Sequence, residues 1–298
     1  MQTVSLVKHL EEQLKNIEEL VVKFITASSI EREVPDPFDD SPFIAVVNNY
    51  YWGEDNDDQK RVQLKMLRTY AAWFEHFNLL FHGSPQETQT KITETNTSVR
   101  EWIEKKNGWN VPRSIADAIK LIHEDFAVYY QLLKVFATPK QADMILVPDT
   151  NALIRCPDVT RFKESVDQPN YTVILISTVL GELDKLKRDH RDMDFRKKVD
   201  SVIRRIKGLR QQGNMREGVI VNKTVTVKMQ AEEPNFDETL SWLDPENADD
   251  RIIANILEIQ RKEPSSMVIL ITADINHQNK AEAANLPFVE PPASISNN

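Results

Sequence analysis

Four acidic residues each follow a strand-like or polar segment. Their positions in the sequence would place them at the same edge of a sheet. Asp149 directly follows the apolar run MILVP, and Asp274 follows MVILIT after one alanine. Glu182 lies in the first turns of the segment after YTVILIS, and Asp250 opens the helical segment DRIIANILEIQ. In an α/β sheet, strand carboxyl ends and the helices that begin there face the same edge. The four carboxylates are therefore predicted to converge on one crevice.

Carboxylates gathered in one dry crevice repel each other by several kcal/mol for each close pair, and a cation removes this repulsion. Oxygen ligands without His or Cys suit Mg²⁺ or Mn²⁺, which keep waters and substrate phosphate in their remaining positions. Such an ion orients and deprotonates a water and offsets charge on the leaving oxygen. The pattern predicts metal-assisted hydrolysis of a phosphodiester.

Each acid also has an ordinary structural explanation when it is taken alone. The helix dipole favours acids near helix N-termini, which applies to Glu182 and Asp250. Asp149 in DTN and Asp274 in TAD fit turn or cap positions. The coincidence of one acid at each of four sheet-edge positions favours a shared site.

The elements that must position these acids predict an α/β fold for residues 141–290. Apolar runs at 144–148, 171–177 and 267–272, with a strand region at 218–229, alternate with helical segments at about 178–212 and 248–263. Strands separated by helices require crossover connections, which build a doubly wound, mostly parallel sheet. Residues 291–298 are predicted to form a disordered tail.

Residues 1–140 are predicted to form an all-α helical accessory domain, because their apolar residues recur at helical spacing. The first segment carries one apolar stripe, made of Val7, Leu10, Leu14, Ile17, Val21 and Phe24. Ser84 with Glu87, and Ser114 with Asp117, fit capping boxes and predict helix starts. The polar stretch 138–143, TPKQAD, is the predicted linker.

Composition bounds the class of protein. A chain of 298 residues is long enough for about two domains. The 37 Lys and Arg against 46 Asp and Glu give a net charge of −9, which argues against nucleic-acid binding through global positive charge. The single cysteine, Cys156, excludes an internal disulfide and any zinc site with two thiolates. Neither a membrane-spanning run nor a signal peptide is visible, so we expect a cytoplasmic protein without a membrane partner.

A local basic run stands out within this acidic chain. From Glu182 to Arg216 there are twelve Lys and Arg against six Asp and Glu. If the run flanks the crevice, it would hold a phosphate backbone; it also fits a solvated amphipathic helix, and the two interpretations are compatible. Arg251 is equally suited to contact a substrate or to form an ion pair on the surface. The predicted nucleic-acid contacts are Lys185, Lys187, Arg188, Lys197, Lys198, Arg204, Arg205 and Arg251.

Four segments in order, VPDTNALI, STVLGELDKLK, NADDRIIA and ITADINHQNKA, resemble the PIN-domain nucleases over about residues 144–289. The resemblance implies a metal-dependent RNase that uses Mg²⁺ or Mn²⁺. The acidic positions of the family fall on Asp149, Glu182, Asp250 and Asp274. Asp250 is preferred to Asp249 because it matches the D-x-x-I-A pattern. The supporting polar positions are Thr150, Asn151, Asp249 and Thr272.

The leading hypothesis is an endoribonuclease that cleaves single-stranded RNA, with the helical half serving recognition, a protein partner or homo-oligomerisation. One alternative is a PIN-like scaffold that binds RNA or a protein without cleaving. Another is a structure-specific DNase. A phosphatase of the haloacid-dehalogenase type is set aside, because it needs a second Asp two residues after Asp149, where Asn151 stands.

Overall fold

The structure is a computed structural model that describes residues 5–32, 50–108, 110–136 and 143–293. The chain divides into two compact units, Val7–Ala137 and Met1–Leu6 with Thr138–Asn298. Most of the predicted linker, residues 138–142, lies outside the described residues. Among the described helices, none combines the length and hydropathy that a bilayer crossing requires.

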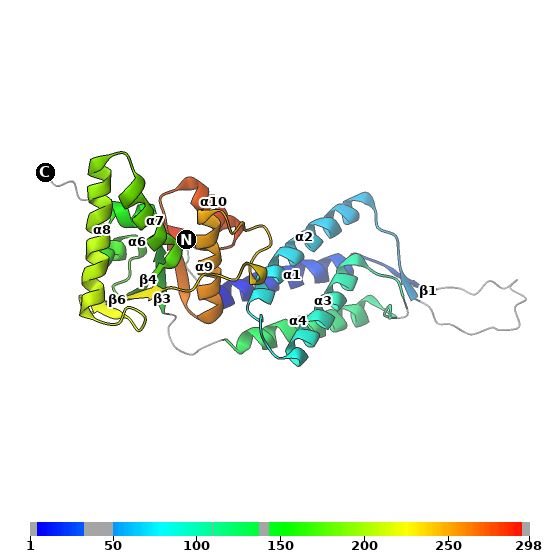
Figure 1. Cartoon of the computed structure of the whole chain (residues 1–298). Coiled ribbons are helices and arrows are strands. Elements are labelled where there is room, and N and C mark those ends of the chain that lie inside the picture. Colours follow the sequence, from blue (N-terminus) through cyan, green and yellow to red (C-terminus); the bar gives the residue numbers. More distant parts are fainter. Residues whose placement is uncertain (1–4, 33–49, 109, 137–142, 294–298) are drawn as a thin grey trace, which may run out of the picture. The chain divides into compact units, whose positions relative to one another are not determined.

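The N-terminal unit is built from four helices (Figure 1). They are α1 (Leu6–Thr26), α2 (Asp57–Leu79), α3 (Gln86–Glu104) and α4 (Ile115–Lys134). A short antiparallel pair, β1 (Ile30–Arg32) with β2 (Tyr50–Trp52), adds to them and was not predicted. The helical prediction is confirmed, and this small sheet supplements it.

Buried aromatic residues form the core of the helical unit. The hydroxyl groups of Tyr70 and Tyr129 lie 2.6 Å apart, and the Trp73 indole donates to the carbonyl of Leu10 at 3.0 Å. Each of these large rings is thereby both packed and hydrogen-bonded, as buried Tyr and Trp require. All six residues of the predicted α1 stripe are buried. The aromatic residues of this core are inaccessible to nucleobases.

The two predicted helix starts in this unit have different outcomes. Ser114 caps α4, because its hydroxyl accepts from the amide of Asp117 at 3.1 Å. A helix, α3, does begin close to Ser84, at Gln86, but the predicted capping box is wrong, since the N-cap is Pro85 without a side-chain hydrogen bond. The Ser84 hydroxyl instead accepts from the Gln89 side chain at 2.9 Å. A serine before proline can therefore serve the loop rather than the helix.

The C-terminal unit contains a six-stranded sheet in the order β5-β6-β4-β3-β7-β8. Only the edge strand β5 (Val219–Val221) is antiparallel to its neighbour. The parallel strands are β3 (Met144–Pro148), β4 (Tyr171–Ile176), β6 (Val225–Gln230), β7 (Met267–Ile271) and β8 (Phe288–Val289). Strand β3 is buried at every position, as a central strand covered on both faces requires. The predicted fold class, an α/β sheet preceded by a helical region, is confirmed.

Helices and short helical turns connect these strands. They are α5 (Thr150–Arg155), η1 (Val159–Phe162), α6 (Lys163–Val166), α7 (Ser177–Asp189), α8 (Met193–Gln212), η2 (Phe236–Glu238), α9 (Ala248–Lys262) and α10 (Ile275–Ala283). The chain extends from β3 to β4 and β6 on one side, then returns to β7 on the other side of β3. Strand order thus reverses at β3, and the carboxyl ends of β3, β4 and β7 border a crevice. Beyond β8, Pro291 and Pro292 are buried, and 294–298 lie outside the described residues.

Candidate active site

Asp149 stands at the junction between β3 and α5, and four contacts fix its position. Its amide donates to the carbonyl of Ile271 at 3.0 Å, which joins the ends of β3 and β7. Its Oδ1 accepts from the amide of Ala152 at 2.6 Å, and its main-chain carbonyl accepts from Leu153. Its Oδ2 lies 3.5 Å from Nδ1 of His277. Asp149 is therefore an N-cap and a wall of the crevice at once.

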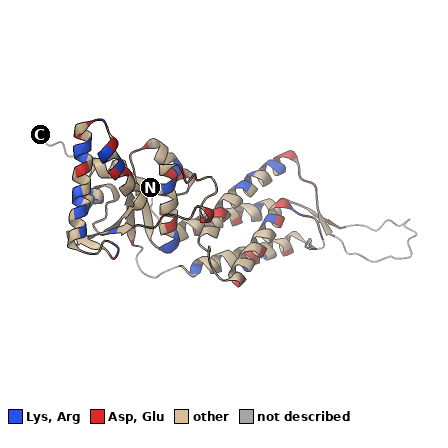
Figure 2. Ribbon diagram, viewed as in Figure 1, with Lys and Arg blue, Asp and Glu red and all other residues tan. Residues whose placement is uncertain are grey.

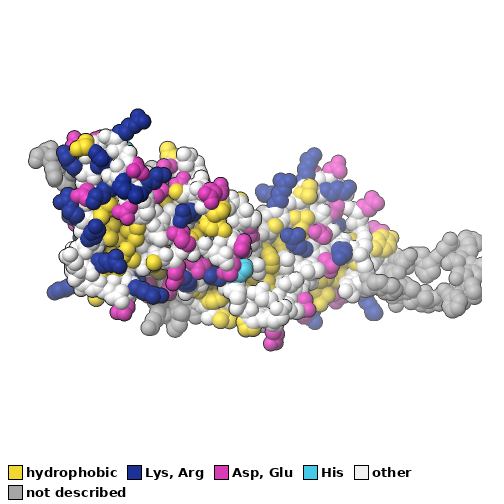
Figure 3. All heavy atoms as spheres, in the orientation of Figure 1, with side chains coloured by type: hydrophobic (Ala, Val, Ile, Leu, Met, Phe, Trp, Pro, Cys, Tyr) yellow, Lys and Arg dark blue, Asp and Glu magenta, His cyan; other side chains and the backbone are white. Residues whose placement is uncertain are grey.

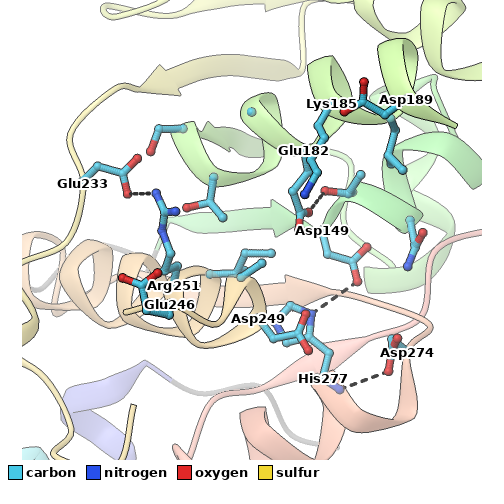
Figure 4. Close-up of a pocket in the computed structure, with 18 of the residues that line it drawn as sticks. Asp149, Glu182, Lys185, Asp189, Glu233, Glu246, Asp249, Arg251, Asp274 and His277 are labelled. Atoms are coloured by element: carbon cyan, nitrogen blue, oxygen red, sulfur yellow. Dashed lines mark hydrogen bonds and ion pairs between the residues drawn. The ribbon is translucent and has the colours of Figure 1, made fainter. Parts of the chain in front are cut away.

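Glu182 approaches the same crevice from α7 and contacts α5. The hydroxyl of Thr150 donates to Oε2 of Glu182, so the residue after Asp149 holds an acid of α7. Thr150 is buried, whereas its neighbour Asn151 is exposed at the cleft. In Figure 4, Asp149 and Glu182 both line the cleft, and a dashed line joins the Glu182 carboxylate to the hydroxyl that donates to it.

Asp274 begins α10 as its N-cap. Its Oδ1 accepts from the amides of Asn276 at 2.8 Å and His277 at 3.4 Å. Its own amide donates to the hydroxyl of Thr272 at 3.0 Å. Thr272 is fully buried and does not line the cleft, so its contact with the acid runs through the backbone. Asp274 is exposed, which leaves its carboxylate accessible from the cleft.

At the start of α9 the structure reverses the expected order of two adjacent acids. Asp249 lines the cleft, whereas Asp250 does not. Asp250 is buried, with Oδ1 2.8 Å from Nζ of Lys280 and Oδ2 accepting from the amide of Asp244 at 3.1 Å. One step along a helix rotates the side chain by about 100°. That rotation directs Asp250 to α10 and leaves Asp249 at the cleft, and the metal-binding role of Asp250 stays a prediction.

These residues enclose a cleft with a volume of about 770 Å³ (Figure 4). It is strongly acidic, since its only Lys and Arg among the described residues are Lys185 and Arg251. The carboxylates that line it are Asp149, Glu182, Asp189, Glu233, Glu246, Asp249 and Asp274. Such an excess of negative charge attracts cations and disfavours an unaccompanied phosphate. The cleft itself therefore needs a cation before it can accept a polyanion.

Most of the predicted nucleic-acid contacts lie outside the cleft. Lys185 and Arg251 line it; Arg251 also pairs with Glu233 at 2.7 Å. Partial burial raises the pKa of the Glu233 carboxyl, but the contacts with Arg251 and Ser177 together outweigh burial and hold that pKa below its usual range. The others are Lys187, Arg188, Lys197, Lys198, Arg204 and Arg205, which do not line the cleft.

Several cations of this outer set are occupied by neighbouring acids. Lys187 and Arg204 both pair with Asp200, at 2.5 and 2.8 Å, and Lys197 pairs with Asp194 at 2.8 Å. Figure 2 shows how densely Lys and Arg occur along α8. Binding a phosphate here competes with these ion pairs, so the basic run is a weaker nucleic-acid surface than its net charge indicates.

The chemistry of the donors fits a hard divalent cation, although the side chains are not drawn around one point. Within the described ranges, no three side chains of His, Cys, Asp or Glu are grouped closely enough to hold an ion. The donors are nonetheless oxygens, and they come from several elements at one sheet edge. Asp189, Glu233 and Glu246 join the cleft without having been predicted.

Two basic residues of α10 also went unpredicted. His277 is almost fully buried against Asp149, and Lys280 holds Asp250. The available signal was their position on the short helix that begins at Asp274, three and six residues along. A helix that follows a strand end directs its first turns to the same crevice.

Residues 146–290 match the family model of the PIN domain. The match spans the six-stranded sheet from within β3 to β8 and every residue that lines the cleft. No curated protein matches the chain significantly.

Proposed function

Because residues 146–290, the C-terminal half of the chain, belong to the PIN-domain family of nuclease folds, we propose that the protein is a metal-dependent endoribonuclease acting on single-stranded RNA. One observation carries the proposal. Acids from the ends of β3 and β7 and from the starts of α7 and α9 line a single cleft. Their distant positions in the sequence make a purely local explanation insufficient.

The residues that would hold Mg²⁺ or Mn²⁺ are Asp149, Glu182, Asp249 and Asp274. When bound, the ion supplies activation of a water molecule and offsets charge on the oxygens of the scissile phosphate. Thr150 orients Glu182 through its hydroxyl, and His277 restrains Asp149. Lys185, for which no ion pair is found within the described ranges, is placed to contact the incoming phosphate.

A single strand is the preferred substrate because of the size of the cleft. Its volume of about 770 Å³ lies in the range of ordinary small-molecule pockets. It therefore accommodates one or two nucleotides with their bases unpaired rather than a duplex. Unpaired RNA also exposes the base edges that allow selectivity.

Incubation of the purified full chain with end-labelled single-stranded RNA tests the proposal. We expect internal cleavage with Mn²⁺ or Mg²⁺ and none with a chelator. We expect Asp149→Asn to abolish cleavage while circular dichroism remains that of the parent. If Asp149→Asn cleaves RNA as fast as the parent, the proposed site is rejected. If the parent cleaves RNA equally fast in the chelator, its dependence on metal is rejected. Single-stranded and flap DNA of matched sequence test the DNase alternative.

A non-cleaving scaffold is the second candidate, and one observation favours it. Lys280 already supplies a positive charge to the acids that begin α9, at 2.8 Å from Asp250 and 3.6 Å from Asp249. Calorimetric titration with Mn²⁺ separates the two candidates. The enzyme must bind Mn²⁺ and lose that binding in Asp149→Asn, whereas a scaffold needs no ion.

We assign recognition or oligomerisation to the helical unit. Light scattering of the full chain tests oligomerisation.

A further inference from the structure

A second hollow lies beside the acidic cleft and has the opposite charge. It has a volume of about 580 Å³ and lies over the carboxyl end of β6. Its cations are Arg210, Arg216 and Lys228, and its apolar floor is made of Ile174, Met215 and Met229. We call this hollow the basic groove. A smaller hollow of about 170 Å³ between α7 and α8 shares Arg210 and Met229 with it.

The charges of the basic groove are available for a ligand. Glu232 is its only acid among the described residues, and Lys262 holds that carboxylate at 2.8 Å. Arg216 approaches Glu232 only to 3.8 Å, with both side chains largely exposed. No ion pair is found for Arg210 or Lys228 in the described part of the chain. These cations differ in this respect from Lys197 and Arg204 on α8, which are paired.

The backbone holds the groove in shape. The amide of Met229 donates to the carbonyl of Met215 at 2.8 Å, which fastens the loop after α8 to β6. Gly218 has a φ of +119°, and a Cβ there would approach Thr226 to 2.7 Å and the Lys228 stem to 3.4 Å. The Lys228 stem therefore lies across a glycine that leaves room for it. Figure 3 shows hydrophobic side chains exposed between lysine and arginine side chains on the face that carries α8.

The groove and the acidic cleft adjoin along one segment. Residues Gln230, Ala231 and Glu232 line the groove, and Glu233 lines the cleft. Gln230 pairs with Ile176 at the end of β4, and Ser177, the next residue, lines the cleft. The two hollows therefore meet at consecutive residues, Glu232 of the groove and Glu233 of the cleft.

We propose that the basic groove binds the part of a single-stranded RNA that lies outside the cleft, with Arg210, Arg216 and Lys228 on its phosphates and Met229 beneath a base. This proposal rests on the proposed function and names where its substrate is held. The cleft attracts cations and contributes little to binding a polyanion, so affinity must come from a neighbouring basic surface. Cations over an apolar floor suit phosphates joined to unpaired bases, because Met offers an adaptable contact surface.

Fluorescence anisotropy with the full chain tests the groove without cleavage. A labelled eight-nucleotide single-stranded RNA is titrated in EDTA over a series of salt concentrations. We expect Arg210→Gln/Arg216→Gln/Lys228→Gln to lower affinity at least about tenfold and to reduce the salt slope by about 2, since each contact on a single strand contributes about 0.7. The control, Lys197→Gln/Arg204→Gln/Arg205→Gln, removes the same charge from residues that already pair with acids, and it is expected to reduce the slope less than the groove variant does.

Three outcomes would contradict the proposal that the basic groove binds RNA. The first is an unchanged slope in the groove variant, and the second is an equal loss in both variants, which would indicate net charge alone. The third is displacement of the RNA by poly-glutamate of equal charge as effectively as by unlabelled RNA, which would indicate an acidic protein ligand. Unchanged circular dichroism of both variants excludes misfolding. The proposed function fails independently, when the parent chain with Mn²⁺ cleaves no single-stranded RNA.

Discussion

The Lys280 ammonium group lies 2.8 Å from Oδ1 of Asp250 and joins α10 to the start of α9. The same Nζ is 3.0 Å from Oδ1 of Asn247, the N-cap of α9, and 3.6 Å from Oδ2 of Asp249. One cation thus separates two adjacent acids, with Asp249 at the cleft and Asp250 buried behind it.

This arrangement predicts unequal effects of two neighbouring substitutions. We expect Asp249→Asn to weaken Mn²⁺ binding about tenfold or more, because a carboxylate of the cleft is lost. We expect Asp250→Asn to change Mn²⁺ affinity less and the free energy of unfolding more, because it removes the partner of Lys280. Calorimetry with Mn²⁺ and urea unfolding measure the two effects. The reverse ranking in Mn²⁺ affinity would reinstate Asp250 as the metal ligand.

Lys280→Met is predicted to destabilise the C-terminal unit by about 1–3 kcal/mol, since Asp250 is left buried without its cation. The double variant Asp250→Asn/Lys280→Met is expected to recover part of this loss, because no unpaired charge remains. Urea unfolding of the parent, both single variants and the double variant gives the coupling energy. Strict additivity of the two losses would show that the pair is not coupled.

Thr150→Val tests the contact that orients Glu182. Valine keeps the shape of the buried side chain but removes its donor, so Glu182 loses the hydroxyl that holds Oε2. We expect Mn²⁺ affinity to fall about 10- to 100-fold, the usual effect of losing a group that orients a ligand. Thr150→Ser retains the hydroxyl and should remain close to the parent. Equal Mn²⁺ affinity of the valine variant and the parent would contradict the assigned role.

Tyr171 at the start of β4 predicts a loss of stability in alkali. Its hydroxyl donates to the carbonyl of Val159 at 2.8 Å, and burial raises its pKa to about 12. An unfolded tyrosine ionises near pH 10. The stabilisation of the folded state by the Tyr171 hydroxyl is therefore complete below about pH 10. It declines as the pH rises towards 12, because over this range the tyrosine ionises more readily in the unfolded chain than in the folded one.

The matched variant is Tyr171→Phe. It should be less stable than the parent near neutral pH by about 1 kcal/mol, the usual net value of a buried hydrogen bond. The difference should shrink above pH 10 and reverse before pH 12, since only the parent has a Tyr171 hydroxyl to ionise and a shift of this size exceeds about 1 kcal/mol. Urea unfolding followed by circular dichroism at pH 8, 10 and 12 measures it. A difference that stays constant across this range would contradict the assigned pKa.

Local pattern was sufficient to predict most strands of the sheet. The runs MILVP and YTVILIS form β3 and β4 because uninterrupted apolar residues suit strands buried on both faces. The same rule placed Asp149 and Asp274 at strand ends and hence at the cleft. Strand β8 has only Phe288 and Val289, too few residues to produce a recognisable pattern.

That pattern could not predict the directions in which neighbouring acids of one helical turn point. Asp249 and Asp250 differ by one rotation on α9, and the inward one is paired with Lys280, which lies on a different helix. Similarly, the exposed run on α8 has a high local charge, but pairing with Asp200 and Asp194 shows only in three dimensions. Long-range contacts of single side chains decide these points, and a sequence pattern contains no information about them.

Asp149 and Asp274 each bind the first amides of the helix that they begin. Their negative charges are thereby compensated by the main chain whether or not an ion is present. The folded state consequently has electrostatic support of its own, and the chelated chain should remain folded at ordinary temperature. Because an ion that binds only the folded chain stabilises it, the melting temperature should rise with the Mn²⁺ concentration from that folded baseline.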